Sequence, residues 1–286
     1  MWQPGGEDPG KSGRTIPLRA RRPAGPPPAS PGRGRSSPRR PRSRWRGFLA
    51  SLVSLVVVLV LLGAVAFGAL LLLTPSVSNA GALVRAQNLA HHAADLGPPV
   101  PDRFAAALEA TEDHRFTEEP GVDPIAIVRV IVAHLDGRGD QGGATLYQQL
   151  AKVLYTQDRA GAAVELEQVA LAVKLRFSYS AQQILQMYVG VVYFGHGFYG
   201  LQDASCGYFG TSPASLSWPQ AALMAGLVQG PSADDPLTYP ARARAREEHV
   251  LGRLVATGAL TQDQASAALR IPVSTLVANA GQGCSA

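Results

Sequence analysis

Lysine and cysteine are both scarce in this chain of 286 residues, and their scarcity excludes some kinds of chemistry. The three lysines are Lys11, Lys152 and Lys174, and none follows a serine at the spacing of a Ser-x-x-Lys motif. The chain therefore lacks the acyl-transfer site that is built on that motif. The two cysteines, Cys206 and Cys284, lie outside any cluster with metal-ligand spacing, and the sequence does not decide whether they form a disulfide.

Patterns typical of β-strands are also few, and helix signals take their place. Apolar residues recur at helical spacing over 104–110 and again over 165–177. Capping boxes, in which Ser or Thr precedes Gln by three residues, mark three further helix starts: Ser180–Gln183, Ser217–Gln220 and Thr261–Gln264. The sequence therefore predicts a mainly α-helical fold.

Charge is distributed unevenly along the chain. Residues 1–47 are rich in Pro, Gly, Ser and Arg, and they hold twelve Lys or Arg against Glu7 and Asp8. That composition cannot bury a core, so we expect a disordered basic tail. The tail sums to +10 and the whole chain to +5, so residues 48–286 sum to −5. Because the part expected to fold is acidic, we expect no nucleic-acid partner.

Charged residues are absent from 48–73, a run of 26 residues dominated by Leu, Val and Ala. About 20 apolar residues span a bilayer, so this run predicts a single transmembrane helix. Three arginines precede it: Arg42, Arg44 and Arg46. The positive-inside rule then places the tail in the cytoplasm and residues 74–286 outside the cell membrane. A cleaved signal peptide is the alternative, supported by the small residues at 80–82, but the length of the run favours an uncleaved anchor.

The residues that suggest chemistry lie between Glu112 and Lys152. Glu112 and Asp113 follow the predicted helix at 104–110, so a pair of carboxylates ends an apolar helix. Further on, a Gly-rich turn leads into a helix start with polar and cationic side chains: Thr145, Gln148, Gln149 and Lys152. A basic carboxylate beside a site for a phosphate-like anion indicates group transfer from a phosphorylated donor.

A third block of glycines and aromatic residues follows at 184–188, 192–200 and 208–210, with an apolar stretch at 223–227 after it. The glycines fit tight turns between packed helices, and the aromatic residues fit a core or a surface that faces sugar. In this order and spacing, the three blocks resemble those of the family 51 glycosyltransferases, the peptidoglycan transglycosylases. The resemblance covers about residues 97–272.

The resemblance implies a mainly α, lysozyme-like transglycosylase domain with a jaw that touches the membrane. Members of this family polymerise lipid II outside the cytoplasmic membrane, release undecaprenyl pyrophosphate and invert the anomeric configuration. By resemblance, Glu112 is the general base, a role that needs a carboxylate shielded from water so that its pKa rises. Asp113 would orient the site. The alternative interpretation of Glu112 is an ordinary surface carboxylate at a helix end.

The resemblance also assigns Lys152 to the donor pyrophosphate and places Thr145, Gln148 and Gln149 in the same groove. As alternatives, the two glutamines are polar helix surface and Lys152 is a solvated charge. A Mg²⁺ or Mn²⁺ ion often assists the leaving group in this family, and no organic cofactor is expected. Because Mg²⁺ prefers carboxylate, phosphate and water oxygens, we expect no dedicated protein cage for it.

The sequence departs from the family pattern where the second catalytic carboxylate is expected. Counting from Lys152 places that glutamate on Gln168, and the Arg-Lys pair before it falls on Val164 and Glu165. An amide cannot carry charge or donate a proton as an acid. Smaller departures are Ala144 for Ser, Tyr147 for Thr, Glu119 for His, Gln186 for Glu and Gly190 for Asn.

Three residues are candidates to compensate for these losses. Glu165 lies one helical turn before Gln168, on nearly the same face. Glu167 is adjacent to Gln168 but rotated by about 100°. Arg159 could replace the missing cations.

Two functions therefore stay open. The leading one is a membrane-anchored, monofunctional peptidoglycan glycosyltransferase, and the other is a catalytically degenerate relative that binds lipid II or acts as a scaffold in cell-wall assembly. A lysozyme-like hydrolase is a third class, but it needs two suitably spaced carboxylates. The expected partners are lipid II, lipid-linked glycan, the membrane, a separate transpeptidase and other cell-wall proteins.

The remaining segments are assigned by composition. Residues 74–96 are expected to be a helical or loose connector and 273–286 a C-terminal tail. The apolar segment 125–135 is too short to span a bilayer, so it is either a core helix or an interfacial segment.

Overall fold

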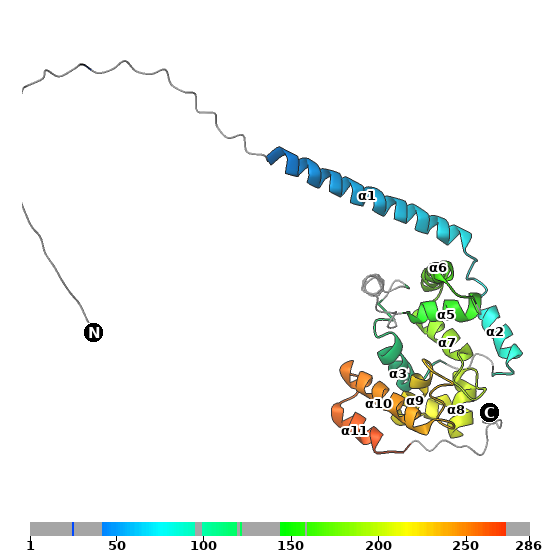
Figure 1. Ribbon diagram of the computed structural model, residues 1–286. Coiled ribbons are helices and arrows are strands. Elements are labelled where there is room, and N and C mark those ends of the chain that lie inside the picture. Colours follow the sequence, from blue (N-terminus) through cyan, green and yellow to red (C-terminus); the bar gives the residue numbers. More distant parts are fainter. Residues whose placement is uncertain are drawn as a thin grey trace, which may run out of the picture. The chain divides into compact units, whose positions relative to one another are not determined.

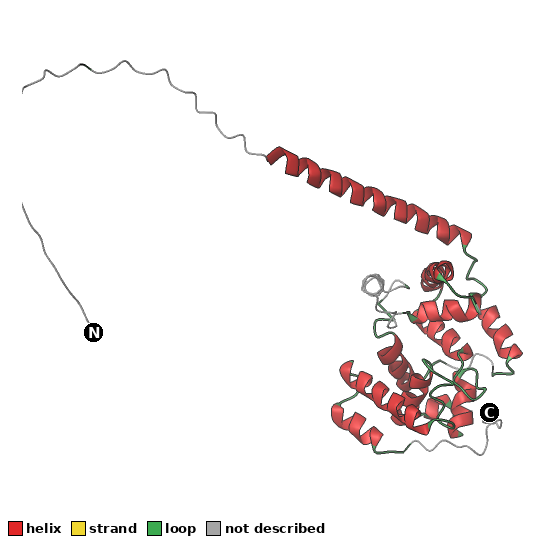
Figure 2. Ribbon diagram, in the orientation of Figure 1, coloured by secondary structure: helices red, strands yellow, loops and turns green. Residues whose placement is uncertain are grey.

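The computed structural model describes Gly25 and residues 42–94, 99–118, 121, 144–157 and 159–272 (Figure 1). In this part of the chain the structure is helical, with no strand beyond an isolated bridge between Tyr193 and Tyr199 (Figure 2). The helices are α1 (Arg42–Leu73), α2 (Ala80–Ala90), α3 (Asp102–Glu112), α5 (Leu146–Tyr155), α6 (Ala162–Ser178), α7 (Ala181–Val191), α8 (Leu201–Phe209), the 3-10 turn η1 (Pro213–Ser215), α9 (Trp218–Leu227), α10 (Pro240–Ala256) and α11 (Gln262–Leu269). The predicted mainly α fold is confirmed.

Helix α1 contains the apolar run that was predicted to cross a membrane. Its segment Gly47–Leu73 has 27 residues and is long and apolar enough to span a bilayer. Its large apolar side chains are exposed, for example Leu72 at 88% and Leu73 at 84%, as expected for a surface that faces lipid. The helix ends at Leu73 as predicted, but it begins at Arg42, inside the segment assigned to the tail.

The segment 74–96, predicted to be a connector, contains the core helix α2. Ala80 and Val84 lie four residues apart, on one face of the helix, and both are fully buried. Through this face α2 packs against α7 and α5. The folded domain therefore begins before residue 97, where the sequence placed its boundary.

The other described helices form two packed groups with a common core (Figure 1). In one group α3, α9 and α10 pack together, and α11 lies against α10. In the other group α5, α6 and α7 pack together, and α2 lies against α7. Buried aromatic side chains from both groups fill the core, including Phe104 on α3, Tyr147 on α5 and Tyr188 on α7. The groups meet where α3 ends and α5 begins, which is where the candidate site lies.

Capping boxes fix the starts of several helices. The three predicted boxes are confirmed at α7, α9 and α11. A further box, which was not predicted, starts α5: Gln148 N donates to Thr145 Oγ1 at 3.2 Å, and Thr145 N donates to Gln148 Oε1 at 3.1 Å. The two bonds give partners to the backbone N–H groups of Thr145 and Gln148, which have no partner within the helix.

Gly121 packs closely against α6 and accepts a hydrogen bond from the residue that caps α5. Its φ of +96° favours glycine, and a Cβ there would lie 2.7 Å from the carbonyl oxygen of Ala172 on α6. The carbonyl oxygen of Gly121 accepts a hydrogen bond from Thr145 Oγ1 at 2.9 Å. The apolar segment predicted at 125–135 and most of the Gly-rich turn before Ala144 lie outside the described residues.

Candidate active site

The candidate base, Glu112, is the last residue of α3, and its backbone is held from two sides. Arg253 Nε of α10 donates to the carbonyl oxygen of Ala110 at 2.9 Å, which ties down the last turn of α3. Asp113 follows Glu112 and is buried, and its Oδ2 accepts a hydrogen bond from Leu146 N at 3.0 Å. Leu146 is the first residue of α5, so the Asp113 carboxylate also lies at the positive end of that helix dipole. Asp113 thus fixes the end of α3 against the start of α5.

A chain of side-chain hydrogen bonds orients the Glu112 carboxylate. Gln149 Nε2 donates to Glu112 Oε2 at 3.1 Å and to the Ala144 carbonyl oxygen at 3.3 Å. Tyr188 OH, from α7, donates to Gln149 Oε1. Because the tyrosine hydroxyl donates to the amide oxygen, the amide nitrogen is the atom that faces Glu112. The chain therefore presents Glu112 as an acceptor and leaves its Oε1 for another partner.

Burial raises the pKa of the Glu112 carboxyl above its ordinary value. The hydrogen bond from Gln149 and the charge of Arg246 act in the opposite direction and are the smaller effects. Burial also raises the pKa of Tyr188, and the nearby Glu112 charge adds to that shift. A carboxylate that binds a proton more strongly than an exposed glutamate is suited to act as a general base near neutral pH.

Lys152 lies on the same face of α5 as Gln149. Gln149, Lys152 and Thr156 are spaced by three and four residues, so they form a row along that face and past the helix end. The row is about 10 Å long at 1.5 Å per residue. The Lys152 side chain is exposed and makes no ion pair with any described residue. Its charge is thus available to an anion that lies along the row.

Near the far end of this row, the side chains of α6 make a hydrogen bond and an ion pair. Gln168 Nε2, from α6, donates to Thr156 Oγ1 at 2.8 Å. Arg159 and Glu167 form an ion pair with an NH2–Oε2 distance of 2.7 Å. Glu165 is exposed on the first turn of α6. Two of the three candidates for compensation, Arg159 and Glu167, are therefore paired with each other.

We use two names for these regions. The "base end" is Glu112, Asp113, Gln149, Tyr188 and Arg246. The "anion end" is Lys152, Thr156, Arg159, Glu167 and Gln168. The structure brings together three of the predicted residues at the base end: Glu112, Asp113 and Gln149. Two others lie at the anion end, Lys152 on α5 and Gln168 on α6.

Thr145 and Gln148 use their side chains to start α5. Thr145 is 3% exposed and exchanges hydrogen bonds with Gln148 and Gly121. In this arrangement they position Gln149 and Lys152, which follow on the same helix. A contact of either residue with substrate stays a prediction, as do the other assigned roles.

Two residues of the base end were missed by sequence reasoning. Arg246 lies on α10, where it pairs with Asp234 at 3.5 Å and donates to the Gly226 carbonyl oxygen at 3.3 Å. Its side chain is 21% exposed, and its charge lowers the pKa of Glu112. Tyr188 was seen only as an aromatic residue of the third block. No local pattern connects either residue to Glu112, because the contacts depend on how distant helices pack.

The described residues include no group of three His, Cys, Asp or Glu side chains that could hold a metal ion. Mg²⁺ at a phosphate site usually keeps several waters and needs only one or two carboxylates from the protein. Such an ion would take most of its ligands from the donor pyrophosphate and from water. A role for Mg²⁺ or Mn²⁺ stays a prediction.

Comparison with known proteins gives a family that fits this site. The family model described as "Transglycosylase" matches residues 83–255. A predicted transglycosylase of Cupriavidus necator is 32% identical over 231 residues, which cover 80% of this chain and 97% of that protein. Penicillin-binding protein 1A of Aquifex aeolicus is 36% identical over 176 residues, or 61% of this chain and 24% of that protein. The crystal structure of penicillin-binding protein 1A from Haemophilus influenzae is 27% identical, with a TM-score of 0.33, and covers 46% of this chain and 16% of that one.

The helical domain and the matched family model define a peptidoglycan transglycosylase domain of glycosyltransferase family 51. The chain belongs to the transglycosylase family. It spans nearly the whole length of the Cupriavidus relative but only about a quarter of the Aquifex penicillin-binding protein 1A. The family match begins at residue 83, within α2, which agrees with the place of that helix in the core.

Proposed function

We propose that the protein polymerises lipid II into glycan strands and releases undecaprenyl pyrophosphate. The observation that carries this proposal is the geometry of Glu112. Its carboxyl has a raised pKa and accepts a hydrogen bond from Gln149, which lies on the same face of α5 as Lys152. Membership of the transglycosylase family supports the same reaction class. The reaction is an inverting transfer of a glycosyl group from a lipid pyrophosphate to a sugar hydroxyl.

In this reaction Glu112 takes the proton of the acceptor's 4-hydroxyl. Gln149 occupies Oε2, so we assign the proton to Oε1. The hydroxyl oxygen forms a bond to the anomeric carbon of the donor as the bond from that carbon to the pyrophosphate oxygen breaks. The bonding electron pair leaves with undecaprenyl pyrophosphate. General-base catalysis of such a step typically contributes about 10²–10⁴-fold.

Lys152 stabilises the pyrophosphate as negative charge develops on it. The row along α5 places this lysine one helical turn from Gln149, so the base and the cation face one substrate groove. Asp113 does not take part in proton transfer in this account, because its Oδ2 accepts from Leu146 N. It is a positioning residue that fixes the C-terminal end of α3, and with it Glu112, against the start of α5.

We place the domain outside the cytoplasmic membrane, anchored by α1 with the basic tail in the cytoplasm. The arginines before the apolar run support this orientation through the positive-inside rule. Cys206 is disulfide-bonded, which supports it independently, because disulfides persist in oxidising compartments. Since the chain has no Ser-x-x-Lys motif, cross-linking of the product would come from a separate transpeptidase.

The anion end favours a second candidate function, a lipid II-binding scaffold without catalysis. Gln168 holds Thr156 where the family pattern has a charged acid, and Arg159 is paired with Glu167. Such a protein would still bind the pyrophosphate through Lys152. The two functions share a ligand and differ in turnover.

The test is to incubate the full chain, solubilised in detergent, with labelled lipid II. Appearance of glycan polymer establishes the transferase. Bound but unconverted lipid II would establish the scaffold. Cleavage of added glycan strands in place of polymerisation would contradict both and identify a hydrolase.

A further inference from the structure

Lys174 on α6 is a partly buried cation that the proposed reaction does not use. Its Nζ donates to the carbonyl oxygens of Thr74 and Pro75, just past the end of α1, at 2.7 and 3.0 Å. An ammonium group has three N–H donors, so one donor is left for a further partner. In the described part of the chain, no carboxylate forms an ion pair with Lys174. Because a partly buried charge is usually compensated, this position calls for an anion.

The Lys174 side chain lines a pocket of about 640 Å³, a size typical of ligand pockets. One wall is the chain from the last turn of α1 to the start of α2, and the other is the last two turns of α6. Leu72 and Phe177, one from each wall, are 88% and 80% exposed. Ser76 and Ser178 are also exposed and add hydroxyl groups. The pocket thus combines a cation and hydroxyl donors with large apolar side chains that no described residue covers.

The end of α1 fixes the depth of this pocket in a membrane. A bilayer core of about 30 Å takes about 20 helical residues. Counted from Phe48, the first residue of the uncharged run, they end near Gly68. The headgroup layer adds about 5–7 Å, or about four residues of helix. Leu71 and Leu72 therefore fall in this layer, at the level of the lipid phosphates.

The pocket is separate from the anion end. Lys174 follows Gln168 by six residues on α6, so it lies about 9 Å further along the helix and about 120° around it. The inference that follows therefore does not rest on the proposed function.

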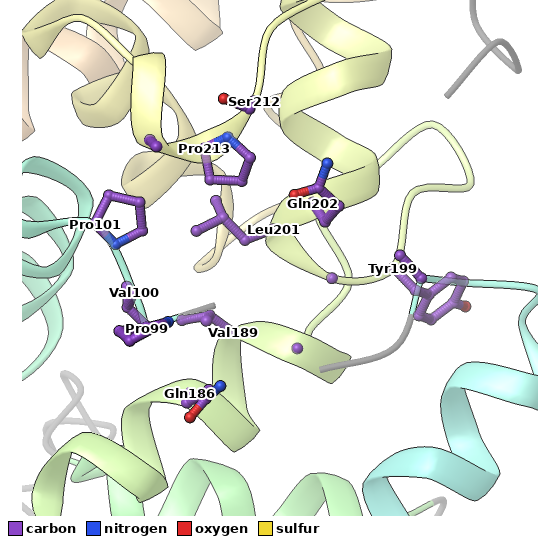
Figure 3. Close-up of a pocket in the computed structure, with 14 residues that line it drawn as sticks. Pro99, Val100, Pro101, Gln186, Val189, Tyr199, Leu201, Gln202, Ser212 and Pro213 are labelled. Carbon is purple, nitrogen blue, oxygen red and sulfur yellow. The ribbon is translucent and has the colours of Figure 1, made fainter. Parts of the chain in front are cut away.

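A second pocket, of about 350 Å³, lies at the other end of α3 from Glu112 and differs in chemistry (Figure 3). Its labelled side chains are mainly prolines and valines, with the amides of Gln186 and Gln202. Among the described residues that line it, none is a lysine or an arginine. A phosphate would find no cation there, whereas the pocket at Lys174 supplies one.

We propose that the pocket at Lys174 binds an anionic phospholipid of the surrounding membrane. The lipid phosphate accepts the remaining N–H of Lys174 and the hydroxyl of Ser178. The acyl chains run along Leu72 and Phe177, which continue the lipid-facing surface of α1 onto α6. A lipid bound in this way joins the end of the membrane anchor to the helix that carries Gln168, and so holds the domain at the membrane surface.

The first test measures how tightly the full chain, purified in detergent, retains phosphatidylglycerol. Dioleoyl phosphatidylglycerol is titrated into the protein, and the lipid-bound fraction is measured by native mass spectrometry. Dioleoyl phosphatidylcholine has the same acyl chains and a phosphate but no net charge. It should bind at least about tenfold more weakly, because Lys174 then gains no net anion. Equal affinities for the two lipids would overturn the proposal.

Lys174→Met should weaken binding of phosphatidylglycerol about tenfold or more, and Lys174→Arg should retain it, because it keeps the charge. The matched control is Arg176→Met, which removes one positive charge from the same helix. Arg176 does not line the pocket, and its Cβ faces Gly121 instead. Equal losses in Lys174→Met and Arg176→Met would assign the effect to overall charge and contradict the site.

A second variant leaves the hydrogen bonds of Lys174 intact. Ser178→Trp fills the pocket from the end of α6 and should also weaken binding of phosphatidylglycerol about tenfold, as for the loss of buried apolar contacts. Ala163→Trp adds the same side chain at an exposed position in the first turn of α6, outside the pocket, and should bind as the unmodified protein does. Unchanged binding by Ser178→Trp would place the lipid elsewhere and overturn the proposal.

Two competitors identify the source of the phosphate. Glycerol 3-phosphate lacks acyl chains, so at millimolar concentration it should leave phosphatidylglycerol bound. An equimolar amount of lipid II should also leave it bound, because the α5 row lies elsewhere on the domain. Displacement by glycerol 3-phosphate would reduce the pocket to a site for free phosphate, and displacement by lipid II would make it part of the substrate site. Either result would contradict a phospholipid site.

Discussion

The base end and the anion end both include a residue from one face of α5, Gln149 and Lys152, yet the two ends differ in how they hold their charges. At the base end Glu112 is partly buried and receives one hydrogen bond from Gln149, whose amide is in turn fixed by Tyr188. At the anion end Arg159 and Glu167 neutralise each other near the surface, and Gln168 contributes only an amide. The partly buried carboxylate of Glu112 accepts a hydrogen bond from an uncharged amide, whereas the charges of Arg159 and Glu167 compensate each other.

The difference also shows which substitutions the fold tolerates. Residues of the base end hold helices together: Asp113 joins α3 to α5, and Tyr188 joins α7 to α5. Their replacement would disturb both packing and chemistry. Glu165 and Arg159 are exposed, so a change at these positions costs the fold little. The anion end can therefore depart from the family pattern while the domain still folds.

The largest effect is expected from Glu112→Gln, which removes the base and keeps the size and hydrogen-bonding capacity of the side chain. Lipid II polymerisation should fall at least about 100-fold. The matched control is Glu109→Gln, one turn earlier on α3. Burial also raises the pKa of Glu109, but in the described part of the chain it is Glu112, and not Glu109, that accepts a hydrogen bond from Gln149. Comparable losses in both variants would remove the distinction between Glu112 and its buried neighbour.

Lys152→Ala tests whether the anion end still binds phosphate. Charge-assisted hydrogen bonds to an anion contribute about 1.5–3 kcal/mol, so affinity for lipid II should fall about tenfold or more. Lys174→Ala is the control, because its Nζ donates to the carbonyl oxygens of Thr74 and Pro75 at 2.7 and 3.0 Å, away from the α5 row. Equilibrium binding of labelled lipid II measures both. If the two variants bound equally well, Lys152 would not belong to the site.

Arg246→Met should move the pH profile of activity. The Arg246 charge lowers the pKa of Glu112, so its loss raises that pKa further, and the acidic limb of the profile shifts to higher pH by about one unit. Arg246→Lys keeps the charge and should restore the profile. Arg242→Met removes another partner of Asp234, at 3.1 Å, without changing the charge near Glu112. A shift of the same size in Arg242→Met would assign the effect to Asp234 instead.

The smallest effect concerns stability at the base end. The pKa of Glu112 is raised in the folded state, so its ionisation opposes folding above the unfolded pKa, and this penalty is absent below it. Glu112→Gln should therefore raise the melting temperature by about 2 °C at pH 7 and leave it unchanged near pH 4. Glu118→Gln, at an exposed carboxylate, should have little effect at either pH. Thermal unfolding is followed by circular dichroism. A lower melting temperature of Glu112→Gln at pH 7 would contradict burial as the dominant influence on the pKa of Glu112.

Much of the fold was predictable because its signals are local. The capping boxes at Ser180, Ser217 and Thr261 fix helix starts within three residues, and the uncharged run before Thr74 is long enough to define α1. The helix α2 was not recognised as part of the core. It buries mainly small side chains such as Ala80, whose apolar pattern is weak in the sequence and becomes clear only against α7.

The candidate site was predictable only along α3 and α5. Glu112 and Gln149 belong to motifs with fixed spacing, and the structure brings them within 3.1 Å. Thr145 and Gln148 resembled groove residues, although a glutamine three positions after a threonine also defines a capping box. Arg246 is 134 positions from Glu112, and such a contact depends on the packing of α10 against α3.

The central claim is that Glu112 is the working base of a transferase whose far end lacks one carboxylate. Its most direct test is lipid II polymerisation by Gln168→Glu, alone and combined with Glu112→Gln. Restoring a carboxylate beside Thr156 should raise the rate of polymer formation by about tenfold, and the added Glu112→Gln should abolish polymer formation in the same background. Polymer formed equally fast by Gln168→Glu and by the double variant would contradict the assignment of Glu112.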